Sequence, residues 1–170
     1  MIQPKRINKE HLFLTTSAAV CLAFMAFAAI VFPAFKVANL TIPAVEETIK
    51  YNVLGTNAIF GGKIVTAQGF TIGEFNFSLL SLIAYLLPLA SVVVSVLAFK
   101  KNGPLLNYVA AILAFGGAVM MFFQLSFIKF EPIANLNVEF KLFVGPILGS
   151  IFSALAGCFN LGCTSIKNIK

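Results

Sequence analysis

Charged residues divide the sequence into four long apolar stretches. Positions 12–35, 75–99, 102–128 and 142–166 contain no Asp, Glu, Lys, Arg or His. Each stretch exceeds the roughly 20 apolar residues with which an α-helix crosses about 30 Å of hydrocarbon. Helix is the expected conformation because backbone polar groups in lipid must be paired within a helix or a closed barrel, and these stretches lack the alternation of barrel strands. The pattern predicts transmembrane helices at 12–35, 75–99, 103–128 and 142–166.

The first stretch also has features of a signal peptide. Lys5, Arg6 and Lys9 precede it, and Ala26-Phe27-Ala28 resembles a cleavage site. Its apolar part is longer than the roughly 7–15 residues of a signal-peptide core. We therefore expect a retained membrane helix, and for the same reason no lipoprotein processing at Cys21.

The polar segments between the stretches have the pattern of a small β structure. Segment 36–74 is the longest, and Thr, Val, Ile, Tyr and Phe recur in it between Asn and Gly residues. A tight hairpin turn is expected at Gly61-Gly62; a phosphate-binding loop there would need a longer glycine pattern and a following helix. The expected strands, which form one antiparallel sheet, are 37–42, 48–54, 58–60, 63–66 and 70–75.

The second polar segment, 129–141, is short. Lys129-Phe130-Glu131-Pro132 is expected to end the third helix, because the residue before a proline disfavours helical conformation. Residues 135–140 are expected to add one edge strand to the sheet.

Composition and charge assign the chain to a membrane and orient it. The sequence is 59% hydrophobic and 11% charged, with a mean hydropathy of +0.96, whereas soluble domains carry about 25% charge. The side with both termini and the turn 100–104 holds seven Lys or Arg against Glu10, and the other side holds five Lys against five Glu. Because cytoplasmic loops are enriched in Lys and Arg, both termini are predicted in the cytoplasm, with 36–74 outside a plasma (inner) membrane.

These features define the predicted fold class. It is an all-α membrane protein, a single domain over 1–170, built as an antiparallel four-helix transmembrane bundle with a small antiparallel β-rich extracytoplasmic cap. The net charge of +6 is explained by topology and by contact with anionic membrane lipids, so no nucleic-acid partner is expected.

Candidates for catalysis, metal binding or a cofactor are lacking. No ionisable residue lies within the four stretches, which disfavours a proton relay or an ion-coupled transporter. The lone His11 lies at the start of a helix, Cys158 and Cys163 lack zinc-site spacing, and the sequence has no Asp. Cys21 and Cys158 are expected to be packing residues, with acylation of Cys163 as a minor alternative. We predict a protein that is not an enzyme and has no cofactor or metal.

The most regular feature is a stripe of small residues in the fourth stretch. Gly145, Gly149, Ser153 and Gly157 recur every four residues, the spacing that lets helix backbones approach closely. The stripe predicts a helix-packing interface, either with helices of the same chain or with another copy or another membrane protein. Ala110, Ala114 and Ala118 form a weaker stripe on the third stretch, and the two stripes are candidates to pack on each other.

Polar residues and a proline mark a possible cavity or hinge. Asn107 and Asn160 are predicted at similar depth, where they are able to hydrogen-bond across the bundle. Pro88 removes a backbone donor in mid-helix and predicts a bend, either a static packing kink or a hinge. Ser91 and Gln124 complete this group of candidate cavity-lining residues.

The arrangement of four spans, a long β-prone first loop and a short second loop resembles the claudin-type tetraspan plan over the whole chain, as topology only. The claudin loop motif has a Gly-Leu-Trp segment and two cysteines, whereas this chain has no Trp and no cysteine in segment 36–74. Barrier formation and a disulfide-braced sheet are therefore not implied. Segment 57–63, followed by hydrophobic helices, is similar to small four-span proteins of low-GC bacteria, and this likeness implies no activity. Eleven Lys against one Arg also favour a bacterial source.

The predicted function is that of a non-catalytic integral membrane protein. It acts as a self-assembling subunit, or as an accessory or scaffold subunit of a membrane complex, with a homo-oligomer or another membrane protein as its partner. The alternative is a small transporter, channel or lipid-handling protein for an uncharged substrate.

Overall fold

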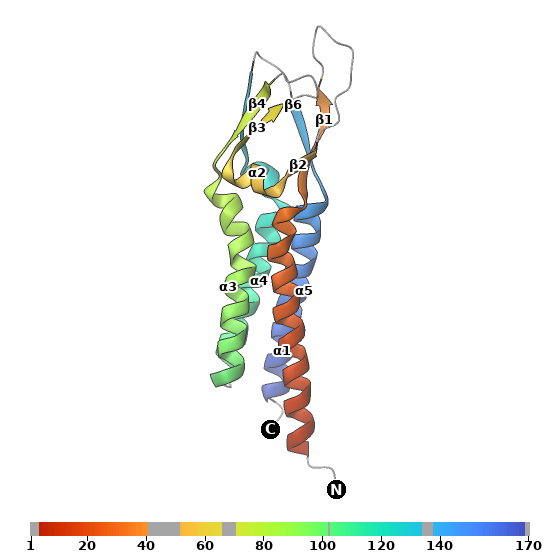
Figure 1. The fold of residues 1–170 in the computed structure, drawn as a ribbon. Coiled ribbons are helices and arrows are strands. Elements are labelled where there is room, and N and C mark those ends of the chain that lie inside the picture. The colour runs from red at the N-terminus through yellow and green to blue at the C-terminus, as the bar shows by residue number, and fades with distance from the viewer. Residues whose placement is uncertain (1–3, 41–51, 66–70, 102, 134–137, 169–170) are drawn as a thin grey trace.

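The computed structural model describes residues 4–40, 52–65, 71–101, 103–133 and 138–168. Within these residues four long helices form a bundle, and strands cap one of its ends (Figure 1). All four helices are long and apolar enough to span a membrane, which is the pattern of a multi-pass membrane protein. They are α1 (Pro4–Ala28), α3 (Leu79–Lys101), α4 (Pro104–Phe122) and α5 (Val144–Asn168). The end of the bundle opposite the cap, where α1 begins and α5 ends, is called the far end below (Figure 1).

The helices end earlier at the cap than the sequence pattern predicted. The first was expected to reach residue 35, but a 3₁₀ turn (η1, Ala29–Val31) follows α1 and strand β1 (Pro33–Leu40) begins at the proline. Phe32, which precedes that proline, is extended, with φ −80° and ψ 158°. The third prediction, to residue 128, was also too long, because α4 ends at Phe122 and a 3₁₀ turn follows it (η2, Gln124–Ser126).

The second helix begins later than the predicted residue 75, because the chain is still in a strand there. Strand β4 (Thr71–Asn76) continues to Asn76, and α3 starts at Leu79. Ser78 caps the helix, since its Oγ accepts a hydrogen bond from the backbone N–H of Ser81 at 3.3 Å.

The strands form two antiparallel sheets, not the single sheet that was expected. One has the order β2-β1-β6, with β2 at Asn52–Leu54 and β6 at Val138–Leu142. The other has the order β3-β4-β5, with β3 at Gly62–Val65 and β5 at Lys129–Pro132. The predicted edge strand at 135–140 corresponds to β6, whereas β5 occupies the segment that was expected only to end a helix. Predicted strand residues 41–42, 48–51, 66, 70 and 135–137 lie outside the described residues.

In each sheet, two paired strands are continuous with two neighbouring helices, which explains why there are two sheets. Strand β1 continues α1 and β6 leads into α5, so the pairing of Phe35 with Leu142 extends the contact between those helices. Strand β4 leads into α3 and β5 follows α4, and Asn76 pairs with Lys129 at their bundle ends. The packing of the helices therefore determines which strands become neighbours.

The Gly61-Gly62 pair ends a helix and does not form the predicted hairpin turn. Residues 58–60, expected as a strand, belong to the short helix α2 (Gly55–Phe60). Gly61 has φ 92° and its N–H donates to Asn57 O at 3.0 Å; a positive φ of this kind is one that glycine adopts readily. A Cβ at Gly61 would also lie only 2.8 Å from Phe75 O, so the tight approach to β4 adds a second requirement for glycine.

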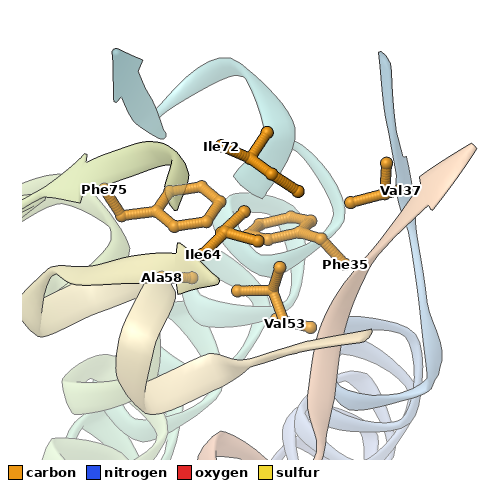
Figure 2. Packing of buried hydrophobic residues seen from close by; sticks show 8 residues of the cluster. Phe35, Val37, Val53, Ala58, Ile64, Ile72 and Phe75 are labelled. Atoms are coloured by element: carbon orange, nitrogen blue, oxygen red, sulfur yellow. The ribbon is translucent and has the colours of Figure 1, made fainter. Parts of the chain in front are cut away.

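One apolar core joins the two sheets and α2. Side chains from four strands and α2 converge in it, and their exposed fractions are 3% or less (Figure 2). The rings of Phe130 on β5 and Phe140 on β6 lie against this core. Their centroids are 4.9 Å apart, and the centroids of Phe75 and Phe130 are 5.0 Å apart. The buried members are Ala34, Phe35, Val37, Val53, Ala58, Ile64, Ile72 and Phe75.

The bundle places small residues inside and large apolar residues outside. Helix α5 packs on α1 and α4, while α3 packs on α4 and less extensively on α1. Large apolar side chains point outward, for example Leu105 and Ile112 with 72% and 69% exposed. This is the distribution expected where lipid is the solvent and close backbone packing joins the helices. Buried alanines inside the bundle include Ala19, Ala23, Ala26, Ala84, Ala98, Ala110, Ala114 and Ala156.

Replacing Gly73 by alanine is expected to destabilise the β3-β4-β5 sheet. A Cβ at this position would overlap the ring of Phe130 and lie 2.7 Å from Glu131 O, so strand β5 would have to move. We expect G73A to lower the free energy of unfolding by about 1–3 kcal/mol. Thermal unfolding in detergent measures this.

Gly62→Ala is the matched control in the same sheet, because its nearest new contact would be an ordinary 3.5 Å to Asn57 Cγ. It should change stability by less than about 0.5 kcal/mol. Equal stability of G73A and the unmodified protein would contradict the close packing of β4 on β5.

Candidate functional site

The small-residue stripe of α5 lies against helices of the same chain. A Cβ on Gly145 would lie 3.1 Å from each of three carbonyl oxygens, those of Ala29, Phe32 and Pro33. A Cβ on Gly149 would lie 2.6 Å from Met121 Sδ and 3.4 Å from Ala26 O. At the cap end the stripe is therefore inserted between α1 and α4.

The remaining stripe positions contact α4. Ser153 Oγ donates a hydrogen bond of 2.7 Å to Ala114 O, and a Cβ on Gly157 would lie 2.9 Å from the ring of Phe115. In the structure the stripe therefore packs on helices of the same chain. Its contact with Ala114 confirms that the stripes of α4 and α5 pack on each other. These contacts bury all four stripe positions within the chain.

A layer of polar side chains crosses the far half of the bundle. Ser91 Oγ donates to Ala110 O at 2.8 Å and joins α3 to α4. Ser95 Oγ lies 2.7 Å from Ser91 O and 2.8 Å from Asn160 Oδ1, so the bond to Asn160 links α3 and α5 across the bundle diagonal. Asn160 Nδ2 donates to Ala156 O at 3.1 Å. The predicted cavity residues Ser91 and Asn160 thus hold helices together.

The predicted hydrogen bond between Asn107 and Asn160 is not formed. The partners of Asn160 are instead Ser95 on α3 and the carbonyl of Ala156, one turn earlier on α5 itself. Asn107 is buried, and its Nδ2 has no hydrogen-bond partner among the described residues. An unpaired amide in the interior is costly, so Asn107 is a weak point of this layer.

Gln124 lies where the bundle meets the cap. Its side chain is fully buried, and its Oε1 accepts a hydrogen bond of 3.2 Å from Tyr85 OH, while its Nε2 has no partner among the described residues. Nearby, Ser78 Oγ donates to Phe127 O at 2.8 Å. These bonds join the first turns of α3 to the segment that leads from α4 into β5, at the junction of bundle and cap.

Pro88 is packed tightly against α4. It is buried in mid-helix, and a Cβ on Gly117 would lie 2.6 Å from its Cδ and 3.3 Å from Ala84 O. The proline ring occupies space that only a glycine on α4 leaves open. This contact is typical of the static kink and leaves little room for hinge motion about Pro88.

The cysteines differ from what was expected. Cys21 and Cys158, predicted as packing residues, are exposed on the outer faces of their helices. Cys163 is buried against α1, where its Sγ lies 3.2 Å from Thr15 Oγ1 and 3.5 Å from Thr16 Oγ1, so an acyl chain would have no access to it. Among the described residues, no group of three or more His, Cys, Asp or Glu side chains could hold a metal ion.

Sequence reasoning missed two grooves on the sides of the bundle. One, of about 300 Å³, lies between α1 and α3 at the far end, and Phe13, Ser17, Val20, Val96 and Phe99 are among its lining residues. The other, of about 350 Å³, lies between α4 and α5 near the cap, where Phe115, Phe122 and Ser150 contribute. The sequence signal that could have indicated the α1/α3 groove is the occurrence of small residues between large ones on one helix face, as at Ser17 and Cys21.

Comparisons of the chain with protein-family models, with curated proteins and with solved structures find no match. The class is therefore defined by the fold alone. In the described residues, a close-packed bundle of four helices, each long and apolar enough to span a membrane, carries two small antiparallel sheets on one apolar core.

Gly117→Ala tests the packing of Pro88. The new methyl group would meet the rigid proline ring at 2.6 Å, so we expect a loss of about 1–3 kcal/mol in the free energy of unfolding. Unfolding in detergent with increasing dodecyl sulfate is a suitable measurement.

The adjacent Gly116→Ala is the control, since its new contact would be an ordinary 3.6 Å to Leu87 Cδ1. Replacing glycine by alanine in a helix is otherwise favourable by up to about 1 kcal/mol. If G117A were as stable as G116A, the contact between Pro88 and α4 would not be as close as described.

Proposed function

We propose that the protein is a non-catalytic membrane subunit that assembles with a second copy or with another membrane protein through its cap. One observation carries this proposal. The candidate polar and small residues of the described bundle are mostly engaged in packing or hydrogen bonds within the chain, as Ser153 with Ala114 and Ser95 with Asn160 are. The exposed surface that remains is lipid-facing helix and the cap.

The cap has features of a binding surface. Strands β2 and β6 are the outer strands of one sheet, and β3 and β5 are those of the other. An outer strand has backbone N–H and C=O groups on its open side that accept a further strand, a common mode of protein recognition. Exposed Lys63 and Val65 on β3 and exposed Ile133 just after β5 offer side chains to such a partner.

The cap is also held in a fixed position, which suits recognition. Its core is continuous through both sheets, and each sheet continues directly into a pair of bundle helices. A partner that binds the described strands therefore meets a surface supported by one packed core, which lowers the entropy cost of ordering it on binding.

The orientation in the membrane is part of the proposal. Lys9, Lys100 and Lys101 are exposed at the far end, whereas the cap strands carry both Lys and Glu. Under the rule that positive residues stay inside, the far end is cytoplasmic and the cap extracytoplasmic, in the plasma (inner) membrane of a bacterium.

The alternative of a transporter, channel or lipid-handling protein for an uncharged substrate has less support. Its proposed path was lined by Pro88, Ser91, Gln124 and Asn160. Pro88 lies against Gly117, and the other three have hydrogen-bond partners in the chain. A path along these residues would require the bundle to open.

Photo-crosslinking tests the assembly through the cap. We would place benzoylphenylalanine at Lys63 on β3 or at Lys141 on β6, both exposed, and irradiate intact membranes. The proposal predicts a covalent product heavier than the 18.3 kDa chain from at least one of these sites. Mass spectrometry of the product identifies a second copy or another membrane protein.

The control is benzoylphenylalanine at Ile112, which is 69% exposed on the outer face of α4. It should give several times less product, because it faces lipid. Product from neither cap site above the level at Ile112 would contradict the proposal.

A further inference from the structure

The groove between α1 and α3 opens sideways on the bundle at its far end. Its walls are mainly apolar, with Phe13 and Val20 on α1 facing Val96 and Phe99 on α3. The rings of Phe13 and Phe99 meet edge to face, with centroids 6.1 Å apart. Phe13, Val96 and Phe99 are exposed, so the groove lies on the surface that lipid would cover.

Lysines stand one helical turn beyond this groove on both helices. Residues four apart lie on the same helix face. Lys9 is therefore one turn farther from the cap than Phe13 on α1, and Lys100 is one turn farther from the cap than Val96 on α3. Helices α1 and α3 run in opposite directions, which places both lysines at the far end. Both are exposed, as is the adjacent Lys101.

Among the side chains that the structure describes, Glu10 and His11 are two further titratable groups on α1 near this end of the groove. Glu10 has an interaction within the chain, and His11 is exposed on the next position of α1. Three lysines against one glutamate leave the mouth of the groove positively charged.

The second groove provides a comparison within the same molecule. It is also apolar and slightly larger, but no charged residue occurs within four positions of its lining on α4 or on α5, that is, in 111–127 and 146–158. Of these two grooves, the one between α1 and α3 is the one that combines apolar walls with a cationic mouth.

We propose that the α1/α3 groove binds an anionic phospholipid. One acyl chain lies along Phe13, Val20 and Val96, and the phosphate lies between Lys9 and Lys100, with Lys101 adjacent. A groove of about 300 Å³ is at the small end of ligand sites, which suits a single chain. A second protein helix would fill the apolar part and leave the lysines without an anion, whereas an anionic lipid satisfies both. This inference goes beyond the proposed function and does not depend on it.

Native mass spectrometry from a neutral detergent tests the site. The lipids added are palmitoyl-oleoyl-phosphatidylglycerol and the zwitterionic palmitoyl-oleoyl-phosphatidylcholine. The unmodified protein should retain phosphatidylglycerol in preference to phosphatidylcholine. The double variant K9Q/K100Q should retain about tenfold less phosphatidylglycerol than the unmodified protein. The matched double variant K63Q/K129Q, which removes two lysines of the cap, should leave it unchanged.

A second pair of variants tests the groove itself. Ser17→Phe fills the α1/α3 groove and should lower retention of phosphatidylglycerol to the level of K9Q/K100Q. Ser150→Phe fills the α4/α5 groove and should leave retention of phosphatidylglycerol unchanged. Cys21→Phe, at an exposed lining position, blocks the same groove without burying its ring and replaces S17F if that variant does not fold. Size-exclusion elution checks the folding of each variant.

Three results would overturn the proposal. The first is equal retention of the two lipids by the unmodified protein. The second is an equal loss of phosphatidylglycerol retention in K9Q/K100Q and in K63Q/K129Q. The third is equal retention of phosphatidylglycerol by the variants that fill the α1/α3 and α4/α5 grooves. None of these results bears on photo-crosslinking at the cap, so failure of the lipid site and failure of the assembly proposal are distinguishable.

Discussion

The close approach of α5 to α1 and α4 is the constraint on which the rest of the structure depends. In lipid, apolar side chains gain nothing by moving from solvent to another helix, so helices associate through close packing and hydrogen bonds. The stripe on α5 supplies both: Gly145 and Gly149 admit the backbone of α1 and its continuation, and Ser153 hydrogen-bonds a carbonyl of α4. Helix α3 then completes the bundle through the contact of Pro88 with Gly117 and the bond between Ser95 and Asn160.

The same approach builds the cap. Gly145 lies against the carbonyls of Phe32 and Pro33, just where α1 gives way to β1. The strand that precedes α5 is thereby brought beside β1, and Phe143 N–H donates to Ala34 O at 2.8 Å to start their pairing. The α3/α4 pair organises the second sheet in the same manner, and one apolar core then joins the sheets. Residues used in this way are not available for chemistry, which is why the proposed function rests on the surface of the cap.

Much of the fold could be predicted from the sequence, because the lipid environment restricts the choices. Uninterrupted apolar stretches predicted four helices, and β-branched and aromatic runs predicted most strands. The errors fall where local patterns compete with tertiary contacts. Apolar residues 32–35 read as helix although Pro33 starts a strand, and Gly61 read as a hairpin turn although it ends α2. The stripe at Gly149 was evident in the sequence, but its partner was not, because small residues suit a contact within a chain as well as one between chains. The two lateral grooves depend on the relative placement of α1 and α3, and of α4 and α5, and no local pattern encodes that placement.

The packing of α5 within its own chain is tested most directly by a disulfide between Ala29 and Gly149. The Ala29 Cβ lies 3.3 Å from the position of a Cβ on Gly149, close to the roughly 3.5–4.5 Å of disulfides. The variant A29C/G149C, with Cys21, Cys158 and Cys163 replaced by alanine, is oxidised in membranes and examined by denaturing electrophoresis and by thiol labelling. Packing of α5 within its own chain predicts a monomeric band in which both thiols are protected and become reactive on reduction. A disulfide-linked dimer, or a monomer in which both thiols stay reactive, would contradict it.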